Sequence, residues 1–431
     1  MPAQPHLSRR TRLAPALALC LAALAVQAEE PVLTAERAVG IALDGNPNLA
    51  QIKARAAALA AVPAQEGSLP DPTLSFEALN LPTASGFNLH QEDMTMLEVG
   101  ISQTLPFPGK LALREQAAAF EAEAAAHTVA EARLRLAREV RSRWWRLAYM
   151  HHALLIIADT EQLLKQVVDI ADTRYRVGEG LQQDVLEARL ELAKLGQERA
   201  QHIGMHRSEI ARLNALLNRP ADTAIRLPEE IDTQLPDLHT GADLAALAEH
   251  NRPVLDQGRK RVDAARSRVA LAEREFYPDF TLGAGYAFRQ STPTGQSRSD
   301  FASFRLSLNL PIYAGSKQAS MVDQRNSELL KERYALEEAE RKIEAELAAG
   351  LAEYRGNREQ FGLYQRDILP LAEQTVIAAL NAYQVGKTDF QAVIRAENAW
   401  FETRLRYWQA LAEARQSLAK LMAVAGDEAE P

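Results

Sequence analysis

The sequence is poor in cysteine, in aromatic residues and in long apolar runs, and each shortage narrows what the chain can be. Among its 431 residues the one cysteine is Cys20. A chain that lost this residue would have no disulfide, thiol nucleophile or thiolate metal site. Beyond the N-terminal segment no run of 18 apolar residues occurs, so we expect no transmembrane helix. Aromatic residues make up only 6% while Ala, Leu, Glu and Arg are abundant, a composition typical of long packed helices.

The first 28 residues have the pattern of a secretory signal peptide. Three arginines between positions 9 and 12 precede an apolar stretch, and Val26-Gln27-Ala28 supplies a small-residue cleavage site. Cleavage after Ala28 would remove Cys20 from the mature chain. Alternatively, Cys20 could carry a lipid anchor, although Leu19 is larger than the small residue that such a site prefers.

Basic residues and catalytic motifs are also scarce. The 49 basic and 57 acidic residues give a formal charge of −8, and loss of the three signal-peptide arginines takes it to −11. Nucleic-acid-binding proteins carry a basic stripe, so we expect no nucleic-acid partner. Gly386-Lys387-Thr388 resembles the end of a phosphate-binding loop but lacks the glycine five residues earlier. We find no catalytic constellation and expect neither enzymatic activity nor a cofactor.

One group of side chains has metal-ligand spacing. His202, Met205 and His206 fall at i, i+3 and i+4, on one face of a helix, where they could hold a soft cation. Histidines spaced in this way on an exposed helix usually bind nothing. We therefore predict no metal site and keep these three residues as candidates only.

The sequence contains an internal duplication. Leu69-Pro70-Asp71-Pro72-Thr73-Leu74 returns 208 residues later as Tyr277-Pro278-Asp279-Phe280-Thr281-Leu282, and Tyr175-Arg176-Val177-Gly178 returns at the same interval as Tyr383-Gln384-Val385-Gly386. Solenoid repeats have periods of about 20–50 residues, so this period indicates a duplicated domain instead. We predict one copy over residues 29–225 and a second over 226–431.

Each copy has the same order of expected elements. Short helices lead to two strands, then to a very long helix, a glycine turn and another long helix. Residues 111–177 contain neither Gly nor Pro, and a helix of roughly 67 residues is about 100 Å long. In the first copy we predict strands at about 72–80 and 96–105 and helices at about 110–177 and 181–218. In the second copy we predict strands at about 279–289 and 302–311 and helices at about 317–385 and 389–424.

One proline distinguishes the two long helices. Pro370 lies inside the second one, where the first copy has Gln162. Proline removes a backbone donor, so we expect a kink there.

The strands alternate apolar and polar residues. In one of them Phe304, Leu306 and Leu308 alternate with Ser303, Arg305 and Ser307. Alternation over about ten residues is typical of a transmembrane β-barrel, although a half-buried sheet of a soluble domain has it too. Each pair of strands is expected to form a hairpin, which returns to the side it left and so places all the helices on one side of the membrane.

Four strands are too few to close a barrel. An open edge in lipid leaves backbone groups unpaired, at several kcal/mol each, so the barrel has to be shared between chains. Two chains would supply eight strands and a filled interior, whereas three would supply twelve and leave a channel. We therefore expect a homotrimer.

With these features the sequence resembles the TolC-like outer-membrane efflux proteins of Gram-negative bacteria. The resemblance rests on the order and the doubling of Asn46-Pro47-Asn48-Leu49, the Leu-Pro-Asp-Pro segment, Leu105-Pro106-Phe107-Pro108-Gly109-Lys110 and the two Val-Gly turns. It implies a mainly α fold with a membrane part: a trimer with a twelve-stranded β-barrel in the outer membrane and a long α-helical barrel in the periplasm. It also implies an exit duct of a tripartite efflux pump, with a periplasmic adaptor (membrane fusion) protein and an inner-membrane transporter of the RND type as partners.

The resemblance further assigns roles to the glycine turns. Contact with the adaptor is implied for Val177, Gly178, Glu179, Val385, Gly386 and Lys387. The same glycines could simply supply left-handed helix C-caps.

The resemblance also places a pore gate near these turns. The candidates are Tyr175, Asp184, Glu187, Tyr383, Asp389 and Arg395. Because Arg395 occupies the position that matches Glu187, a ring of three arginines facing three glutamates could close the tube by ion pairs. Exposed pairs of this kind are each worth only about 0–1 kcal/mol.

Within the family, the segments at 80–82, 94–96 and 107–110 resemble the heavy-metal branch, which would make the cargo copper or cobalt, zinc and cadmium cations. A drug-efflux duct and a type I protein-secretion duct remain alternatives. A periplasmic coiled-coil scaffold without a channel is an alternative of a different class.

Overall fold

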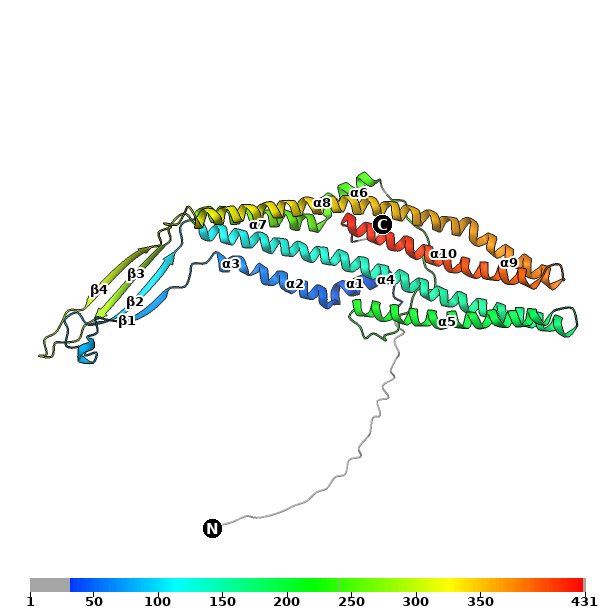
Figure 1. The fold of residues 1–431 in the computed structure, drawn as a ribbon, viewed down its shortest axis with the longest axis horizontal. Coiled ribbons are helices and arrows are strands. Elements are labelled where there is room, and N and C mark those ends of the chain that lie inside the picture. The colour runs from blue at the N-terminus through cyan, green and yellow to red at the C-terminus, as the bar shows by residue number, and fades with distance from the viewer. Residues whose placement is uncertain (1–31, 239, 429–431) are drawn as a thin grey trace, which may run out of the picture.

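The structure, a computed structural model, describes residues 32–238 and 240–428 of a long, narrow molecule (Figure 1). The expected signal peptide and Cys20 lie outside the described residues. A four-stranded sheet forms one end of the molecule, and two helical hairpins form the other (Figure 1). All the α-helices lie beyond the same end of the strands, as the hairpin connections predict (Figure 1).

Both copies contain the same kinds of element. The first comprises α1 (Ala35–Gly45), α2 (Pro47–Ala60), α3 (Val62–Glu66), β1 (Thr73–Leu79), the 3₁₀ turn η1 (Thr83–Ser85), β2 (Met96–Leu105), α4 (Lys110–Arg176) and α5 (Gln182–Leu216). The second comprises α6 (Gly241–Asn251), α7 (Pro253–Arg274), β3 (Phe280–Phe288), β4 (Phe301–Leu308), α8 (Lys317–Leu363), the π turn η2 (Tyr364–Ile368), α9 (Leu369–Gln384) and α10 (Phe390–Ala425). Within the described residues no helix is both long and apolar enough to cross a membrane.

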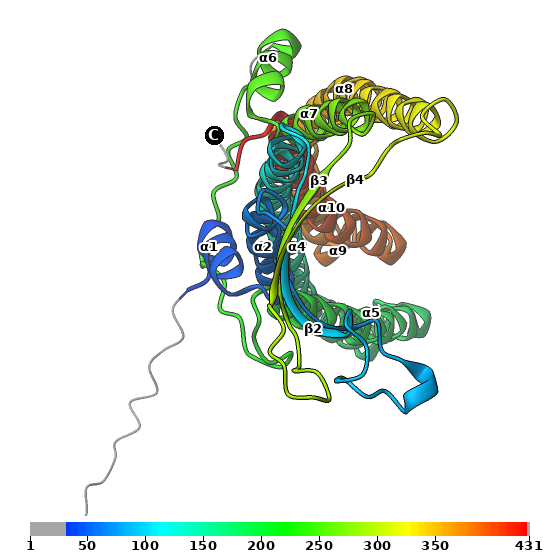
Figure 2. The same ribbon diagram turned by 90° about the vertical axis from the view of Figure 1, so that its left-hand side faces the viewer.

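The sheet has the order β1-β2-β3-β4, and every neighbouring pair is antiparallel. Its strands curve when the molecule is viewed from the sheet end (Figure 2). Thr73 lies opposite Ser102 in the first hairpin, and the equivalent Thr281 lies opposite Ser307 in the second. The duplication therefore extends to the strand register, because matching residues face each other in both hairpins.

Two of the predicted elements differ from the observed ones. Strand β4 ends at Leu308 instead of 311. Beyond it, Asn309 makes only a long backbone bond of 3.4 Å to Asp279, and its side-chain oxygen accepts the Asp279 N–H at 2.5 Å. A side chain thus replaces the ladder, and Pro311 has no N–H with which to resume it.

The helix expected over 317–385 is divided by the π turn. Pro370 has no N–H to donate to the carbonyl of Arg366. The preceding residue, Leu369, donates to Tyr364, five residues back. Pi turns are single-turn insertions that interrupt the regular α ladder, and this one lies directly before the proline that the sequence singled out. In the first copy α4 runs unbroken past the matching Gln162.

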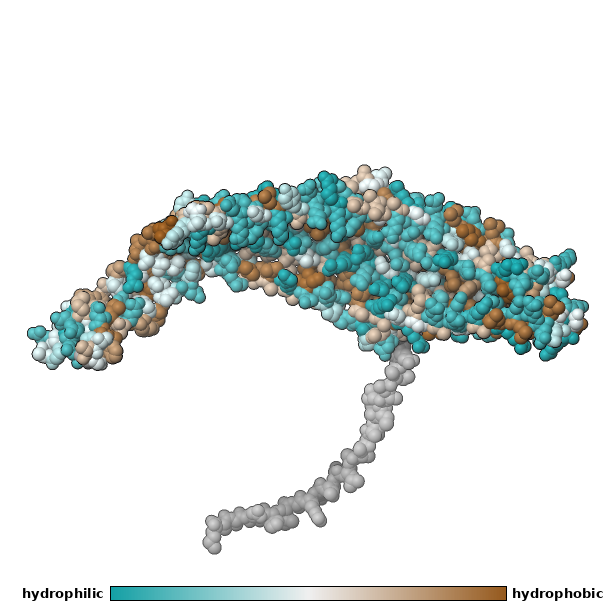
Figure 3. All heavy atoms as spheres, in the orientation of Figure 1, coloured by the Kyte–Doolittle hydropathy of each residue, from teal (hydrophilic) through white to brown (hydrophobic). Residues whose placement is uncertain are grey.

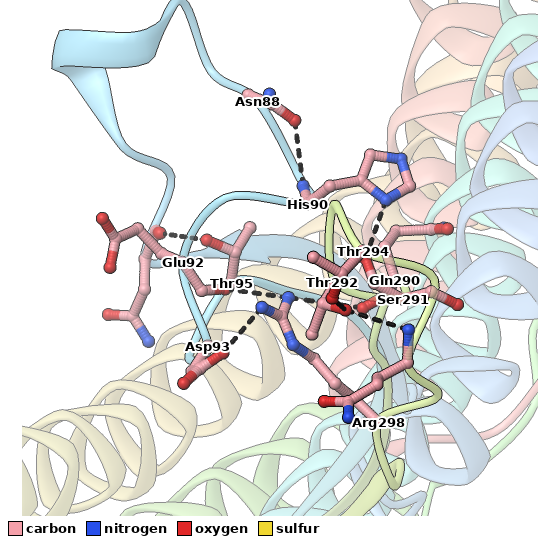
Figure 4. A network of polar contacts seen from close by, with 12 residues as sticks. Asn88, His90, Glu92, Asp93, Thr95, Gln290, Ser291, Thr292, Thr294 and Arg298 are labelled. Atoms are coloured by element: carbon pink, nitrogen blue, oxygen red, sulfur yellow. Dashed lines mark hydrogen bonds and ion pairs between the residues drawn. The ribbon is translucent and has the colours of Figure 1, made fainter.

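The loops beyond the strands meet at the far end of the sheet. Arg298 pairs with Asp93 at 2.6 Å and donates to the carbonyl of Glu92 at 3.2 Å, and His90 Nδ1 lies 2.9 Å from the carbonyl oxygen of Ser291 (Figure 4). The loops of the two hairpins are thereby tied together.

The junction between sheet and helices is built around a buried lysine. Lys110, the first residue of α4, is fully buried. Its ammonium group donates to Glu275 at 2.9 Å, to Asp279 at 2.9 Å and to the carbonyl of Tyr277 at 3.0 Å. The rings of Phe107 and Tyr277 stack beside it with centroids 4.5 Å apart. A buried ammonium is tolerated only when it is paired and hydrogen-bonded, so this cluster fixes the first copy onto the second.

Candidate functional site

The helical end of the molecule contains two turns with the same geometry. Gly178 (φ 80°) follows α4 and Gly386 (φ 71°) follows α9. After α4, Gly178 N–H donates to the carbonyl of Tyr175 at 3.1 Å and Glu179 N–H to that of Arg174 at 2.9 Å. After α9, Gly386 and Lys387 repeat both bonds at 3.0 and 2.8 Å. Each turn is a Schellman cap, which needs a residue in the left-handed region, and glycine adopts that conformation without strain.

The residues expected to contact an adaptor lie at the surface of these turns. Val177 and Val385 are 64% and 67% exposed, and Glu179 and Lys387 are exposed beside them. Each turn therefore presents one exposed valine at the equivalent position. The left-handed caps and the exposed valines occur together at both turns.

A polar network joins the two hairpins just behind the turns. The guanidinium of Arg174 donates to the backbone carbonyl of Tyr383. It also lies over the aromatic ring of Tyr383, 4.7 Å from the ring centroid. Tyr383 is only 3% exposed, and its hydroxyl donates to Asp184 at 3.4 Å. Burial, together with the Asp184 carboxylate, raises the pKa of Tyr383. The network therefore joins α4, α5 and α9, and it brings two of the gate candidates together.

The gate candidates Glu187 and Arg395 contact other residues and not each other. Glu187 accepts hydrogen bonds from Gln183 at 2.9 Å and from Gln391 of α10. Arg395 lies 4.0 Å from Asp389, and both side chains are about 70% exposed. Within one protomer Glu187 is therefore bound by glutamines, and Arg395 is not its partner. Tyr175, at 45% exposure, lies one residue from Arg174 on the surface.

Arg174 and Gln391 were not among the predicted site residues. Arg174 contacts a residue 209 positions away, and nothing local marks such a contact. The signal that could have found it is a difference between the copies, because Ala382 occupies the equivalent position in α9.

The two histidines among the candidate metal ligands each have another neighbour. His202 lies with Nδ1 3.0 Å from the carbonyl of Glu198, while the ring of His206 lies 6.2 Å from that of His151 on α4. Burial lowers the pKa of His206. Across residues 32–238 and 240–428 no group of three His, Cys, Asp or Glu side chains is placed to hold a metal ion.

One acidic residue is buried below the tip. Glu397 of α10 is 2% exposed, and its Oε1 has no hydrogen-bond partner. Burial raises the pKa of Glu397 to about 7, against a weaker opposing effect of Arg404. The carboxyl group is therefore poised between its neutral and charged forms near neutral pH.

The sheet, the long α-helices and the paired tips define a class: a duplicated protomer with a membrane-type sheet at one end and helical hairpins at the other. A sequence profile described as "outer membrane efflux protein" matches residues 38–219 and 244–427, and the chain belongs to this family. Membership confirms the resemblance and places the protein in the outer membrane of a Gram-negative bacterium, extending into the periplasm. Family members are passive channels, so the expectation that the chain is not an enzyme is also confirmed.

Known relatives and structures agree with this assignment. The chain is 25% identical over 297 residues to protein CyaE of Bordetella pertussis, covering 67% of this chain and 61% of CyaE. It is 22% identical over 326 residues to the cobalt-zinc-cadmium resistance protein CzcC of Cupriavidus metallidurans, covering 74% of each. The fold is similar to the open state of the MtrE outer membrane channel of Neisseria gonorrhoeae, with a TM-score of 0.77 at 16% identity over 91% of this chain and 89% of that one.

Proposed function

We propose that three copies of the chain form the outer-membrane exit duct of a tripartite efflux pump. The observation that carries this proposal is the exposed apolar face of an open sheet. Phe304, Phe76 and Leu306 are 88%, 74% and 60% exposed, and hydrophobic residues gather on the sheet while the helical body is largely hydrophilic on the face shown (Figure 3). A soluble domain would bury such a face, whereas lipid favours it.

Closure of the sheet accounts for the number of copies. Strands β1 and β4 are the two edges of the sheet, and an unpaired edge is unstable in lipid. Three copies would supply twelve strands and an open interior, while two would supply eight and a filled one. The long helices would continue the same tube through the periplasm.

The tips are the proposed docking points for a periplasmic adaptor. Val177 and Val385 present apolar side chains at equivalent points, and Glu179 and Lys387 flank them with opposite charges. Charges at the rim of an interface set register more than affinity. An adaptor with helical hairpins could therefore distinguish the first tip from the second.

We place the gate at the network of Arg174, Tyr383 and Asp184. It joins the hairpins by a cation–π contact and hydrogen bonds, so opening the tip by moving one hairpin away from the other would break it. The charged ring of Glu187 and Arg395 remains a contact that copies could form between them, because the protomer leaves Arg395 largely exposed.

The proposed cargo is a heavy-metal cation, supplied by an inner-membrane transporter of the RND type. The name of CzcC, a cobalt-zinc-cadmium resistance protein, supports this choice. The net charge, −8 for the full sequence and −11 without the three signal-peptide arginines, also favours cations, because an acidic duct raises their local concentration. The chain itself acts as a conduit and holds no resident metal in this proposal.

Conductance across planar lipid bilayers tests the duct. We expect the purified full-length protein to give small conductance steps that increase when Arg174→Gln or Glu187→Gln weakens the closed tip. Absence of conductance from all three proteins, together with release of the wild type from membranes by salt, would instead identify a periplasmic scaffold.

Growth of the host under stress tests the cargo. A strain that lacks the gene is expected to become sensitive to cobalt, zinc, cadmium or copper and to regain resistance when the gene is restored. Sensitivity to drugs alone would make the duct a drug exporter, and loss of a secreted protein alone would make it a secretion duct.

A further inference from the structure

The contact between the two copies inside one chain shows how two chains would join. Strand β2 of the first copy pairs with β3 of the second, with Ser102 opposite Gly283 and Gly100 opposite Gly285. Below this pair lies the Lys110 cluster. Strand β4 is the second-copy equivalent of β2, and β1 is the first-copy equivalent of β3. The two free edges of the sheet are therefore the two halves of a second seam of the same kind.

The residues of this second seam are exposed in the protomer. Lys317 is the first residue of α8, as Lys110 is of α4, yet it is exposed where Lys110 is fully buried. Asp71 corresponds to Asp279 and is likewise exposed. Among the described residues, neither Lys317 nor Asp71 has an ion-pair partner in its own chain. Each edge thus presents one half of a lysine–carboxylate pair.

A pair of apolar residues likewise forms a contact at the internal seam and is exposed at the two free edges. Phe107 and Tyr277 stack at the internal seam. Their equivalents are Ile312, which is 75% exposed, and Leu69, which is 51% exposed. Two large apolar side chains left in solvent beside an unpaired strand edge indicate a surface that another molecule covers.

The internal seam also predicts a register for the outer one. When the pairing of β2 with β3 is transferred to the equivalent residues, Ser307 falls opposite Ser75 of a second copy, and Arg305 falls opposite Glu77. Within its own chain Glu77 lies opposite Glu98, and like charges in that position are destabilising. An arginine on the other side of Glu77 would offset this repulsion.

Charge supports this register independently of the repeat. A shift by one residue would place the polar face of one strand beside the apolar face of the other. Shifts by two residues keep the faces aligned but put Arg305 opposite Leu79 or Ser75 instead of Glu77. Only the register taken from the internal seam pairs the opposite charges.

We propose that β4 of one chain pairs with β1 of a second copy in this register, so that Arg305 meets Glu77, Lys317 inserts beside Asp71, and Ile312 packs on Leu69. The inference deepens the proposed function, since it rests on assembly into a closed sheet. The outer seam differs from the inner one in one respect, because Gly67 occupies the position equivalent to Glu275. Lys317 therefore has a single matched carboxylate, with Glu66 one residue away.

Disulfide cross-linking measures the register directly. Residues directly opposite in an antiparallel pair have Cα atoms about 4.5–5.5 Å apart, within the range of a disulfide, whereas diagonal neighbours at about 7–8 Å exceed it. Ser307→Cys combined with Ser75→Cys is the matched pair, in a Cys20→Ser background. Ser307→Cys combined with Thr73→Cys is the diagonal control. Because β1 and β4 are opposite edges of the sheet, neither pair can close within one chain.

We expect the matched pair to link chains into covalent trimers at least about tenfold more efficiently than the diagonal pair under the same mild oxidant. Equal linking, or preferential linking of the diagonal pair, in a protein that is still trimeric overturns the register and leaves the proposed duct standing. A wild-type protein that is monomeric in membranes overturns both.

A charge exchange gives a second, independent readout. Arg305→Glu is expected to reduce the fraction of trimer that survives mild detergent, and Arg305→Glu combined with Glu77→Arg is expected to restore it. A double variant no better than the single one would contradict the pairing, even if cross-linking succeeded.

Discussion

The first copy of the duplicated unit is tied into the protomer, whereas the second copy is partly free. Lys110 is buried against three oxygen acceptors, and its equivalent Lys317 is exposed. The long helix α4 is continuous, and its equivalent is divided into α8 and α9 by a π turn. Of the two similar parts, one fixes the protomer, while the other, we propose, joins neighbouring copies and moves.

Removal of each lysine is expected to give the largest difference between the two copies. Lys110→Met leaves the carboxylates of Glu275 and Asp279 without their buried cation, which should destabilise the protomer by about 3 kcal/mol. Lys317→Met should leave the fold of the protomer intact and weaken only the trimer. Folded yield and thermal unfolding check the first variant, and the trimer fraction in detergent checks the second. Equal effects on the protomer would show that the two lysines do not differ in role.

The buried carboxyl group of Glu397 should make the stability of the second copy depend on pH. The first copy has the exposed Arg189 at the equivalent position and lacks this group. Burial raises the pKa of Glu397 from 4.5 to about 7. The folded state therefore favours the neutral carboxyl group more than the unfolded state does. The stabilisation from this protonated group is complete below pH 4.5 and is lost as the pH rises through about 7. The loss amounts to at most about 3 kcal/mol.

Glu397→Gln is expected to remove this pH dependence and to stabilise the protein at pH 8. Thermal unfolding between pH 5 and 9 measures the effect, with Glu402→Gln on the same helix as the control. A wild type and a Glu397→Gln variant with parallel pH profiles would contradict the assignment.

The tip network also differs between the copies, because Ala382 stands in the second copy where the first has Arg174. Arg174→Gln removes the cation–π contact and the hydrogen bond to Tyr383, together worth about 1–2 kcal/mol. We expect the channel to open about tenfold more often in bilayers. The control is Arg176→Gln, since Arg176 is 77% exposed and, among the described residues, forms an ion pair with Asp172 alone. If both variants open the channel equally, the network is not the gate.

Pro370→Gln gives the second copy the residue of the first and is expected to have the smallest effect. The new N–H can complete the α ladder, so the π turn should revert to α-helix with a change in stability below about 1 kcal/mol. An experimental structure of the variant would show the ladder, and bilayer recordings should show fewer openings. A retained π turn would mean that packing, not proline, causes it.

Several of these features were predictable from the sequence because they are local or repeated. Alternation gave the strands, the absence of Gly and Pro gave the long helix, and Pro370 marked the site of the irregularity. The end of β4 was not predictable, because it depends on the side chain of Asn309 replacing the backbone ladder. The contacts of Lys110 with Glu275 and Asp279 span 165 and 169 residues, and no local pattern encodes them. Lys110 ends one of the repeated sequence motifs, but its role depends on contacts with the second copy.

We propose that three chains close the β-barrel that the four strands of one chain leave open. Native mass spectrometry of the full-length protein, extracted from membranes in a mild detergent, tests it most directly. We expect one dominant assembly with three times the mass of the mature chain. A monomer or a dimer as the dominant species would contradict it.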